Sequence, residues 1–496
     1  MQSPGGCAQQ AKCSPVNHPE WRPSCQSPRR GKATSAIRAT TFGSFVPAWN
    51  VSEAGRPNVP AVTVNASIAC GLVAYGIGLH RATVGEHVNF TVHQFTHVPS
   101  TDGAAFYVRL TGPAILAGSV EGLNGTAWRV SYQAWDPGTY LLELILEYSH
   151  NAYTGPWKTD FLRGACYCNN CCTLGDVDRM RYEGYHVAGS PFVITVAPAP
   201  AVATPLPPCN PTRPLDSGRW VLCDDQRGFV SFVEARWCWR AGACTLLPVE
   251  LFTSQSLAAC AAGKPKRIVL IGDSIMREQA ASMQRLVTSI NSTWTIEFVP
   301  FFGGVTLASG LNTLGRICIA VRAVCQRQDC LVAFNSGAHD AYTRMYGRLH
   351  FPMQYRKLPA FSISAYVGAM SKARDILETV GASQLVFRTS TAVWLKYGTS
   401  YNFNGPRPKD GDLQHQQRFG EGHNVARALN EAAIPLFHRA NWSIVDGYAP
   451  TLPRPDGQAD PLHPGPSLFD PMHAQIFALV FKRHCHAKWH AMHTSM

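Results

Sequence analysis

The sequence contains no uninterrupted apolar run of about 18 residues, the length that a membrane-spanning helix requires, so no transmembrane helix is predicted. It is also poor in charge, because 15% of its 496 residues are Asp, Glu, Lys or Arg, against about 25% in an average soluble domain. Apolar residues make up 46% of the chain and aromatic residues 10%. This composition excludes a disordered, collagen-like or coiled-coil chain and leaves ample material for folded cores.

Clustered positive charge is lacking as well, although the formal net charge is +12. No run of about five or six basic residues occurs, and no nucleic-acid-binding motif accompanies the charge. We therefore exclude a nucleic-acid partner. An acidic polysaccharide partner remains an alternative, but we interpret the charge as a solvated basic surface.

The first 45 residues lack the apolar segment of a signal peptide. By contrast, 17 cysteines and six Asn-x-Ser/Thr sequons indicate disulfides and an oxidising compartment; the sequons are at Asn50, Asn65, Asn89, Asn124, Asn291 and Asn441. Either the N-terminus is incomplete or export is unconventional, and we favour the first. We expect the protein in the secretory pathway: the Golgi lumen, the cell surface or the extracellular space. An odd cysteine count predicts an unpaired thiol, expected among Cys7, Cys13 and Cys25.

Metal-binding patterns are scarce. One C-x2-C unit, Cys168 and Cys171, occurs inside a cluster with Cys166 and Cys172. We interpret this cluster as a disulfide-tied segment, with a metal site as the alternative. The histidines near the C-terminus are interpreted as a solvated tail; they are His484, His486, His490 and His493. No metal and no cofactor is predicted.

The chain divides into a poorly ordered leader (1–58), a β domain (59–196), a Pro-rich linker (197–208) and a third block (209–496). Short alternating runs between turn signals predict a β-sandwich for the second part, with a Cys-rich insertion at 151–185. In the third block, strand-like runs alternate with helix-like stretches. The strand-like runs are 267–271, 330–334, 384–387 and 443–445, and the helix-like stretches are 275–289, 364–380, 421–433 and 471–485. This alternation predicts a mostly parallel sheet with helices on both faces.

The most informative stretch is an apolar strand that runs into Gly272-Asp273-Ser274 and then into a helix. A serine at such a turn is exposed at the carboxyl edge of the sheet, where α/β ligand sites form. Its N–H and the positive end of the helix dipole lie beside it. This placement suits a nucleophile whose attack creates an oxyanion. The alternative is that Ser274 is merely the N-cap of the helix.

A base for Ser274 is available in two Asp-x-x-His motifs, Asp460 to His463 and Asp470 to His473. Asp470 followed by proline is a good helix start, which gives Asp470 a structural role as N-cap and places His473 in the first helical turn. Asp460 and His463 lie in a Pro/Gly-rich loop before that helix. We favour the Asp460/His463 pair and keep Asp470/His473 as the alternative.

The third block resembles the PC-esterase family of the SGNH/GDSL hydrolase superfamily, which includes trichome-birefringence-like and sialic-acid O-acetyltransferases and the NXPE proteins. Gly-Asp-Ser-x-x-Arg-x-Gln at 272–279 matches its signature, and 218–221, 237–246 and 331–339 resemble its flanking motifs. The likeness spans about 209–485. It implies a Ser-His-Asp triad of Ser274, His463 and Asp460 and an acyl-enzyme that passes an acyl group, expected to be acetyl, to water or to a glycan hydroxyl.

The same resemblance implies oxyanion donors among the Ser274 N–H, Gly303, Gly304 and Asn335, of which Asn335 matches its motif better than either glycine does. Arg277, one turn after Ser274, would hold substrate or polarise the acyl group, with a salt bridge at the sheet edge as the alternative. A transferase would need an acyl donor but no cofactor. His339 is interpreted as a supporting residue, not the base. Trp394, Tyr397 and Tyr401 suit sugar stacking, although core packing is the more frequent fate of such residues.

The β domain resembles a filamin-type immunoglobulin-like repeat, on residues 78–85, 90–92, 110–113, 132–140 and 188–196. The resemblance implies a spacer or a protein-binding module. NXPE proteins also place such a domain before the esterase block, so the two resemblances agree. The alternative function is a catalytically inactive secreted or cell-surface binding or adhesion protein that uses this domain.

Overall fold

The computed structural model describes residues 13–14, 24–25, 50–51, 57–58, 68–94, 104–148, 185–199, 206–223, 237–246, 266–289, 294–340, 363–392, 423–457 and 463–484, with gaps at 125, 211, 216, 303, 307–309, 327–328 and 339. Near the N-terminus, β1 (Cys13–Ser14) pairs with β2 (Ser24–Cys25), and β3 (Asn50–Val51) with β4 (Pro57–Asn58). The chain divides into two compact units, of which the first comprises 1–151, 179–203 and 220–238 and the second the remainder. None of the described helices is long and apolar enough to span a membrane.

A mixed network of strands has the order β10-β11-β7-β5-β13-β12-β8-β9-β15-β16, with β14 pairing to β12 and β6. These strands belong to the first unit, except for Gly218–Arg219 of β15 and Trp239–Ala241 of β16, which group with the second. Their bounds are β5 (Ile68–Tyr75), β6 (Arg81–Thr83), β7 (His87–Gln94), β8 (Ala105–Thr111), β9 (Ala114–Ala117), β10 (Ser119–Asn124), β11 (Ala127–Gln133), β12 (Gly138–Tyr148), β13 (Tyr185–Ala188), β14 (Phe192–Ala197), β15 (Gly218–Leu222) and β16 (Trp237–Ala241), with a 3-10 turn η1 (Ile77–Leu79). Residues 220–238, predicted to belong to the third block, group with the first unit because β15 pairs with β9.

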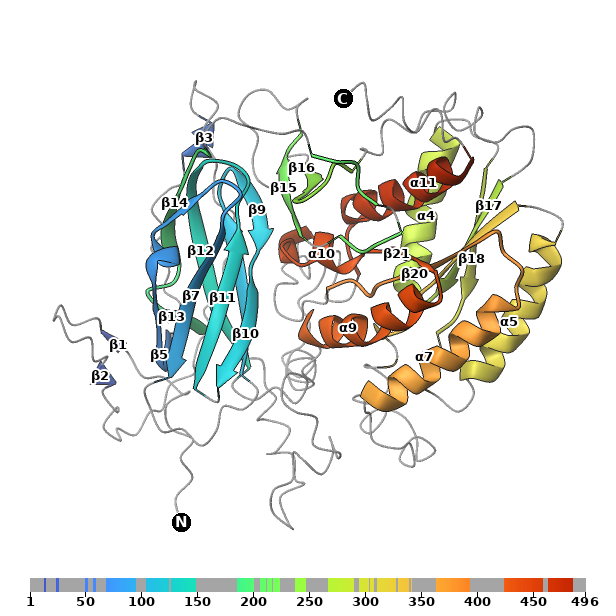
Figure 1. The fold of residues 1–496 in the computed structure, drawn as a ribbon, viewed down its shortest axis with the longest axis horizontal. Helices are drawn as coiled ribbons and strands as arrows, with labels where there is room; N and C mark the ends of the chain where they lie inside the picture. Colours follow the sequence, from blue (N-terminus) through green and yellow to red (C-terminus); the bar gives the residue numbers. More distant parts are fainter. Residues whose placement is uncertain are drawn as a thin grey trace, which may run out of the picture. The chain divides into compact units, whose positions relative to one another are not determined.

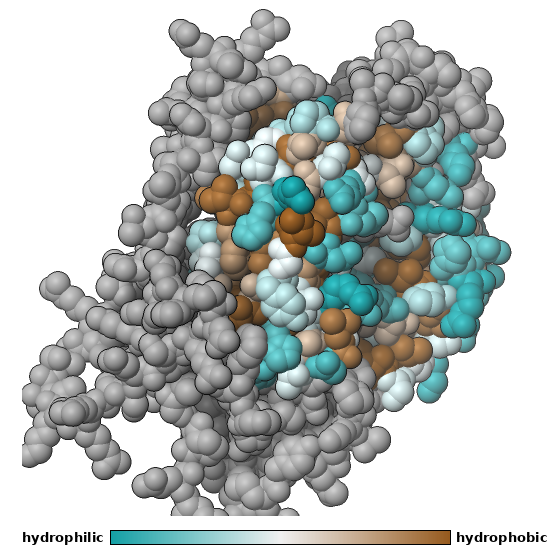
Figure 2. All heavy atoms as spheres, turned by 60° about the vertical axis from the view of Figure 1, so that its left-hand side comes forward, coloured by the Kyte–Doolittle hydropathy of each residue, from teal (hydrophilic) through white to brown (hydrophobic). Residues whose placement is uncertain are grey.

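Two layers of strands enclose the core of this unit (Figure 1). Burial alternates along β7, where Val88, Phe90 and Val92 point inward, as the period of a half-exposed strand requires. Tyr140 and Leu142 of β12 belong to the same hydrophobic cluster. β5 connects the layers, since its start pairs with β13 and its end with β7. On the face drawn in Figure 2, hydrophobic and hydrophilic side chains are intermixed.

Tyr140 closes the turn that leads into β12. Its hydroxyl donates a hydrogen bond to the Asp136 carbonyl at 3.0 Å, across a turn in which Gly138 has φ of 141°, a conformation that favours glycine. The ring of Tyr140 is fully buried. A buried tyrosine bonded to the backbone a few residues upstream is the arrangement of the tyrosine corner in immunoglobulin-like sandwiches.

Replacing Tyr140 by Phe is expected to lower the free energy of unfolding by about 1 kcal/mol, because the Asp136 carbonyl loses its donor while the packing of the ring is kept. Urea denaturation of the full chain measures the change. Tyr75→Phe is the control, since Tyr75 is 51% exposed. Equal effects of the two substitutions would contradict this role of Tyr140.

The second unit is built on a five-stranded parallel sheet with the order β18-β17-β19-β20-β21. Its elements are β17 (Lys266–Gly272), α4 (Ser274–Ser289), β18 (Thr295–Pro300), α5 (Gly310–Cys325), β19 (Asp329–Phe334), α7 (Ile363–Glu378), β20 (Gln384–Arg388), α9 (His423–Arg439), β21 (Ser443–Val445), α10 (Tyr448–Thr451), η6 (Pro455–Gly457), η7 (Pro466–Phe469) and α11 (Asp470–His484). The predicted parallel sheet and its alternating helices are therefore confirmed for this part of the chain.

Strand order decides which face each helix covers. The chain moves outward from β17 to β18 and then reverses to β19, β20 and β21. Because crossover connections are right-handed, α4 covers one face of the sheet, and α5, α7 and α9 cover the other (Figure 1). The order reverses between β17 and β19, and the crevice at the carboxyl ends of those two strands is where ligand sites of such sheets form.

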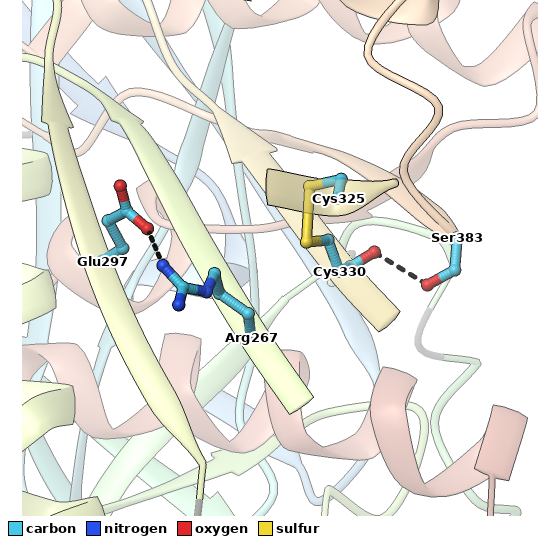
Figure 3. Close-up of a disulfide and its surroundings, with 5 residues drawn as sticks. All are labelled: Arg267, Glu297, Cys325, Cys330 and Ser383. Atoms are coloured by element: carbon cyan, nitrogen blue, oxygen red, sulfur yellow. Dashed lines mark hydrogen bonds and ion pairs between the residues drawn. A yellow bond between two sulfur atoms is a disulfide. The ribbon is translucent and has the colours of Figure 1, made fainter. Parts of the chain in front are cut away.

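β18 and α5 were not predicted from the sequence. β18 is an edge strand that is only half buried, and its Glu297 pairs with Arg267 of β17 at 2.5 Å (Figure 3). An edge strand of this kind lacks the continuous apolar run that marks central parallel strands such as β17.

Three disulfides lie among the described residues: Cys209–Cys244, Cys223–Cys238 and Cys325–Cys330. The last ties the end of α5 to the start of β19, beside the hydrogen bond from the Ser383 hydroxyl to the Cys330 carbonyl (Figure 3). Disulfides are compatible with a secreted or extracellular protein. Cys318 is a free, buried thiol whose pKa is raised to about 12 by burial. An unpaired thiol thus lies in α5, outside the leader where we expected one.

Candidate active site

The carboxyl ends of the three strands β18, β17 and β19 are held together by backbone hydrogen bonds. The Phe301 N–H donates to the Gly272 carbonyl at 2.7 Å, and the Asn335 N–H donates to the Ile271 carbonyl at 3.0 Å. Glycine is required at 272, because a Cβ there would meet the Met276 side chain at 2.5 Å. These contacts place Ser274, the first residue of α4, at the predicted edge of the sheet.

Asp273, not Ser274, caps the helix. The Asp273 carboxylate accepts hydrogen bonds from the N–H groups of Ile275, at 2.9 Å, and Met276, at 3.4 Å. It satisfies two of the donors that a helix start leaves without intrahelical partners. The alternative reading of Ser274 as the N-cap is therefore wrong, and the Ser274 hydroxyl is not committed to capping.

His463 lies against the Ser274 hydroxyl, with Nε2 at 2.7 Å from Oγ. The loop that carries His463 is closed at its base, because the Gly465 N–H donates to the Gly457 carbonyl at 2.8 Å. Asp460 falls in this loop but outside the described residues. A separation of 2.7 Å is within the range expected of a nucleophile and its general base.

His473 occupies a different environment. Its imidazole is buried, its Nε2 lies 3.3 Å from the Gln279 carbonyl, and its Nδ1 lies 3.9 Å from the Asp470 carboxylate. Burial lowers the pKa of His473 to about 4, and the charge of Arg285 acts in the same direction. Asp470 has helical dihedral angles and continues directly from η7, so it is not the N-cap that we expected. Of the two candidate histidines, the structure brings His463 to Ser274.

The candidate oxyanion and substrate residues have differing surroundings. The Asn335 amide nitrogen donates to the Arg388 carbonyl at 2.8 Å and to the Ser390 hydroxyl at 3.3 Å, so an oxyanion would compete with two existing acceptors. Gly304 is described, with φ of 68°, whereas Gly303 lies outside the described residues. Arg277 is exposed and pairs with its neighbour Glu278 at 3.0 Å, not with a group at the sheet edge.

A buried arginine beneath the site was missed from the sequence. Arg388, at the end of β20, has no exposed surface, and its Nε donates to the Gln279 Oε1 at 3.1 Å. Burial lowers the pKa of Arg388 to about 10, and the carboxylates of Asp273 and Asp446 oppose that shift. The guanidinium therefore stays charged at neutral pH. A signal was present, because the strand predicted at 384–387 is followed by the polar residues Arg388-Thr389-Ser390-Thr391 at its carboxyl end.

Several other predicted residues lie outside the described part of the chain: His339, Trp394, Tyr397, Tyr401, His486, His490, His493 and the side chain of His484, together with the cysteine cluster at 166–172. Within the described residues, no group of three or more His, Cys, Asp or Glu side chains could hold a metal ion.

No protein-family model and no curated protein matches the chain. Among solved structures, it is similar to LAE5, an α/β hydrolase from the metagenome of Lake Arreo in Spain, with 12% identity, 44% of this chain and 95% of that chain covered, and a TM-score of 0.29. It is also similar to the Lin-41 filamin domain, with 12% identity, 27% of this chain and 97% of that chain covered, and a TM-score of 0.17. TM-scores this low carry no information on activity.

The buried His473 is expected to make the protein acid-sensitive. Between the unfolded pKa of 6.5 and the folded pKa of about 4, the unfolded chain binds a proton that the folded chain does not. The free energy of unfolding therefore decreases as pH falls through this range, by about 3 kcal/mol in total.

His473→Gln should remove this component, so that the stability difference between variant and wild type shrinks as pH is lowered from 7 to 4. Urea denaturation at several pH values measures it. His438→Gln, at an exposed position on α9, is the control. A pH dependence of His473→Gln identical to that of the wild type would contradict the assignment.

Proposed function

We propose that the chain is a serine-dependent acyl-transfer enzyme, an O-acetyltransferase or acetylesterase that acts on a glycan or glycoconjugate. The observation that carries this proposal is the 2.7 Å separation between His463 Nε2 and Ser274 Oγ. A serine hydroxyl is a weak nucleophile unless a base within hydrogen-bond reach takes its proton. The position of Ser274 at the start of the 16-residue helix α4 adds the positive end of the helix dipole.

The reaction has two displacements. The Ser274 hydroxyl attacks the acyl carbonyl while His463 takes its proton, and the tetrahedral intermediate collapses when His463 returns the proton to the departing alcohol. Ser274 then carries the acyl group. Water or a sugar hydroxyl attacks that ester, again with His463 as base, and Ser274 is regenerated. Asp460 is the predicted partner that orients the imidazole and stabilises its charged form.

Donors for the oxyanion are proposed at the backbone. The Ser274 N–H is not used in the cap that Asp273 forms, and Gly304 lies in the segment that follows β18, the neighbour of β17. Asn335 stays a candidate that would have to exchange its present acceptors for the oxyanion. Arg277 is proposed to hold an anionic or polar part of the substrate, because its exposed guanidinium lies one turn from Ser274.

The resemblance to PC-esterases supports the glycan as substrate class, the acetyl group as acyl group and an SGNH-like fold for the second unit. For the first unit we propose a filamin-type immunoglobulin-like sandwich, with the bond between Tyr140 and Asp136 as support. The disulfides support the secretory pathway as the location. An acyl donor is required for the transferase, and no cofactor is proposed.

The second candidate function is a catalytically inactive binding or adhesion protein that uses the first unit. Exposed apolar side chains on that unit favour it, among them Tyr75, Ile77 and Val193. Labelling of the serine separates the two functions.

A fluorophosphonate probe is expected to label the purified full chain at Ser274, because an activated serine attacks phosphorus and becomes covalently modified. Ser274→Ala should abolish labelling, as measured by mass spectrometry of the intact protein. Ser289→Ala, at the exposed far end of the same helix, should label like the wild type. An unlabelled wild type, or labelling that persists in Ser274→Ala, would rule the enzyme out.

His463→Ala is expected to lower kcat for p-nitrophenyl acetate by about 10²- to 10⁴-fold, because Ser274 loses its general base. His473→Ala should lower stability while the folded fraction keeps turnover close to that of the wild type. Asp460→Asn should reduce kcat by up to about 10⁴-fold if Asp460 holds the imidazole. If turnover were unimpaired in His463→Ala and lost in His473→Ala, the general base would be His473, with Asp470 as its partner.

A further inference from the structure

Asp340 is a buried carboxylate that follows β19 and has no exposed surface. Its Oδ1 accepts a hydrogen bond from the Thr306 N–H at 2.8 Å, and its Oδ2 accepts one from the Ser336 hydroxyl at 2.5 Å. Ser336 is held in turn, because its carbonyl accepts a hydrogen bond from the buried Tyr366 hydroxyl of α7 at 2.6 Å. A buried carboxyl group that accepts these two hydrogen bonds is held rigidly.

The hydrogen bond between Asp340 and Thr306 spans the strand that leads to the proposed nucleophile. Asp340 follows β19, whereas Thr306 belongs to the segment after β18, and β17 lies between these two strands. Ser274 stands directly after β17. The bond between Asp340 and Thr306 therefore joins the two loops that flank the strand of the nucleophile.

Gly304 packs directly against this carboxylate. A Cβ at Gly304 would meet Asp340 Oδ1 at 2.9 Å and its Cγ at 3.1 Å, and the φ of 68° at Gly304 is one that other residues rarely adopt. The Gly304 carbonyl also packs against the start of α5, where a Cβ at Gly310 would meet its oxygen at 1.9 Å. The turn at 304–306 is thus bonded to Asp340 and packed against the start of α5.

We propose that Asp340 is a positioning residue, which fixes the turn at 304–306 so that the Gly304 N–H serves as an oxyanion donor beside Ser274. This inference rests on the proposed function and deepens it. Oxyanion donors act only when they are already aimed at the position where charge develops, about 2.7–3.1 Å away. A backbone donor in a turn needs support from a side chain that is itself locked in place, and Asp340 supplies that support.

The test uses the full chain with p-nitrophenyl acetate as the probe. In Asp340→Ala, kcat is expected to fall about 10²-fold while KM changes less than about threefold, because the donor acts on the transition state and not on the bound ester. Asp340→Asn keeps an acceptor for the Thr306 N–H and should restore kcat to within about tenfold of the wild type. Circular dichroism and urea denaturation measure the folded fraction of each variant.

Asp329→Ala is the matched control. Asp329 lies at the opposite end of β19 and forms an ion pair with Lys266, so its loss disturbs the same strand away from the site. It should leave kcat per folded molecule unchanged. If Asp340→Ala does not fold, Ser336→Ala decides, because it removes one donor to Asp340 and should lower kcat several-fold at constant KM.

The outcomes separate the two proposals. A wild type that neither reacts with a fluorophosphonate nor turns over p-nitrophenyl acetate would overturn the proposed function. An active wild type with unchanged kcat per folded molecule in Asp340→Ala, or in Ser336→Ala where that variant decides, would overturn the role of Asp340 alone. The role of Asp340 would also be overturned if Asp329→Ala lowered kcat as much as Asp340→Ala does, or if Asp340→Asn did not restore kcat. A purely structural role predicts both of these results.

Discussion

Parallel pairing of β17 with a strand on each side is the constraint on which the candidate site depends. The pairing with β18 and β19 continues beyond the strands through the bonds of Phe301 to Gly272 and of Asn335 to Ile271. Backbone bonds of this kind cannot slip by one residue without turning every side chain to the other face. The three loops that begin after residues 272, 300 and 334 therefore start side by side at the carboxyl edge of the sheet, although they are far apart in the sequence.

Beneath this edge, a buried positive charge organises the polar groups. The Arg388 guanidinium binds the side chain of Gln279 on α4 and the Thr389 carbonyl, while the Thr389 hydroxyl donates to Asp446 after β21. Burial raises the pKa of Asp446, and its hydrogen bonds from Tyr448 and Ala449 oppose that shift. A charge without exposed surface is tolerated only where such partners surround it. These polar contacts thus connect α4, the helix that begins at Ser274, to the end of the edge strand β21.

The two Asp-x-x-His motifs show how environment separates identical sequence patterns. His463 follows Gly457 in a loop that is closed by a backbone bond between Gly457 and Gly465. It contacts Ser274 and is only partly buried. His473 is one helical turn into α11, where burial keeps it neutral. The spacing within each motif is the same, and only the surroundings distinguish the two histidines.

The sequence by itself determined the local elements on either side of Ser274. The apolar run before Gly272 and the helical periodicity after it predicted β17 and α4, and the short list of candidates for the base already contained His463, because period and turn chemistry are local properties. Tertiary structure alone decided which histidine meets Ser274 and that the Asn335 amide already has acceptors. It also decided that Arg388 bonds to Gln279 and that Asp340 bonds to Thr306. Each of these depends on contacts between residues tens to hundreds of positions apart, and no periodicity in the chain records which strand ends come together.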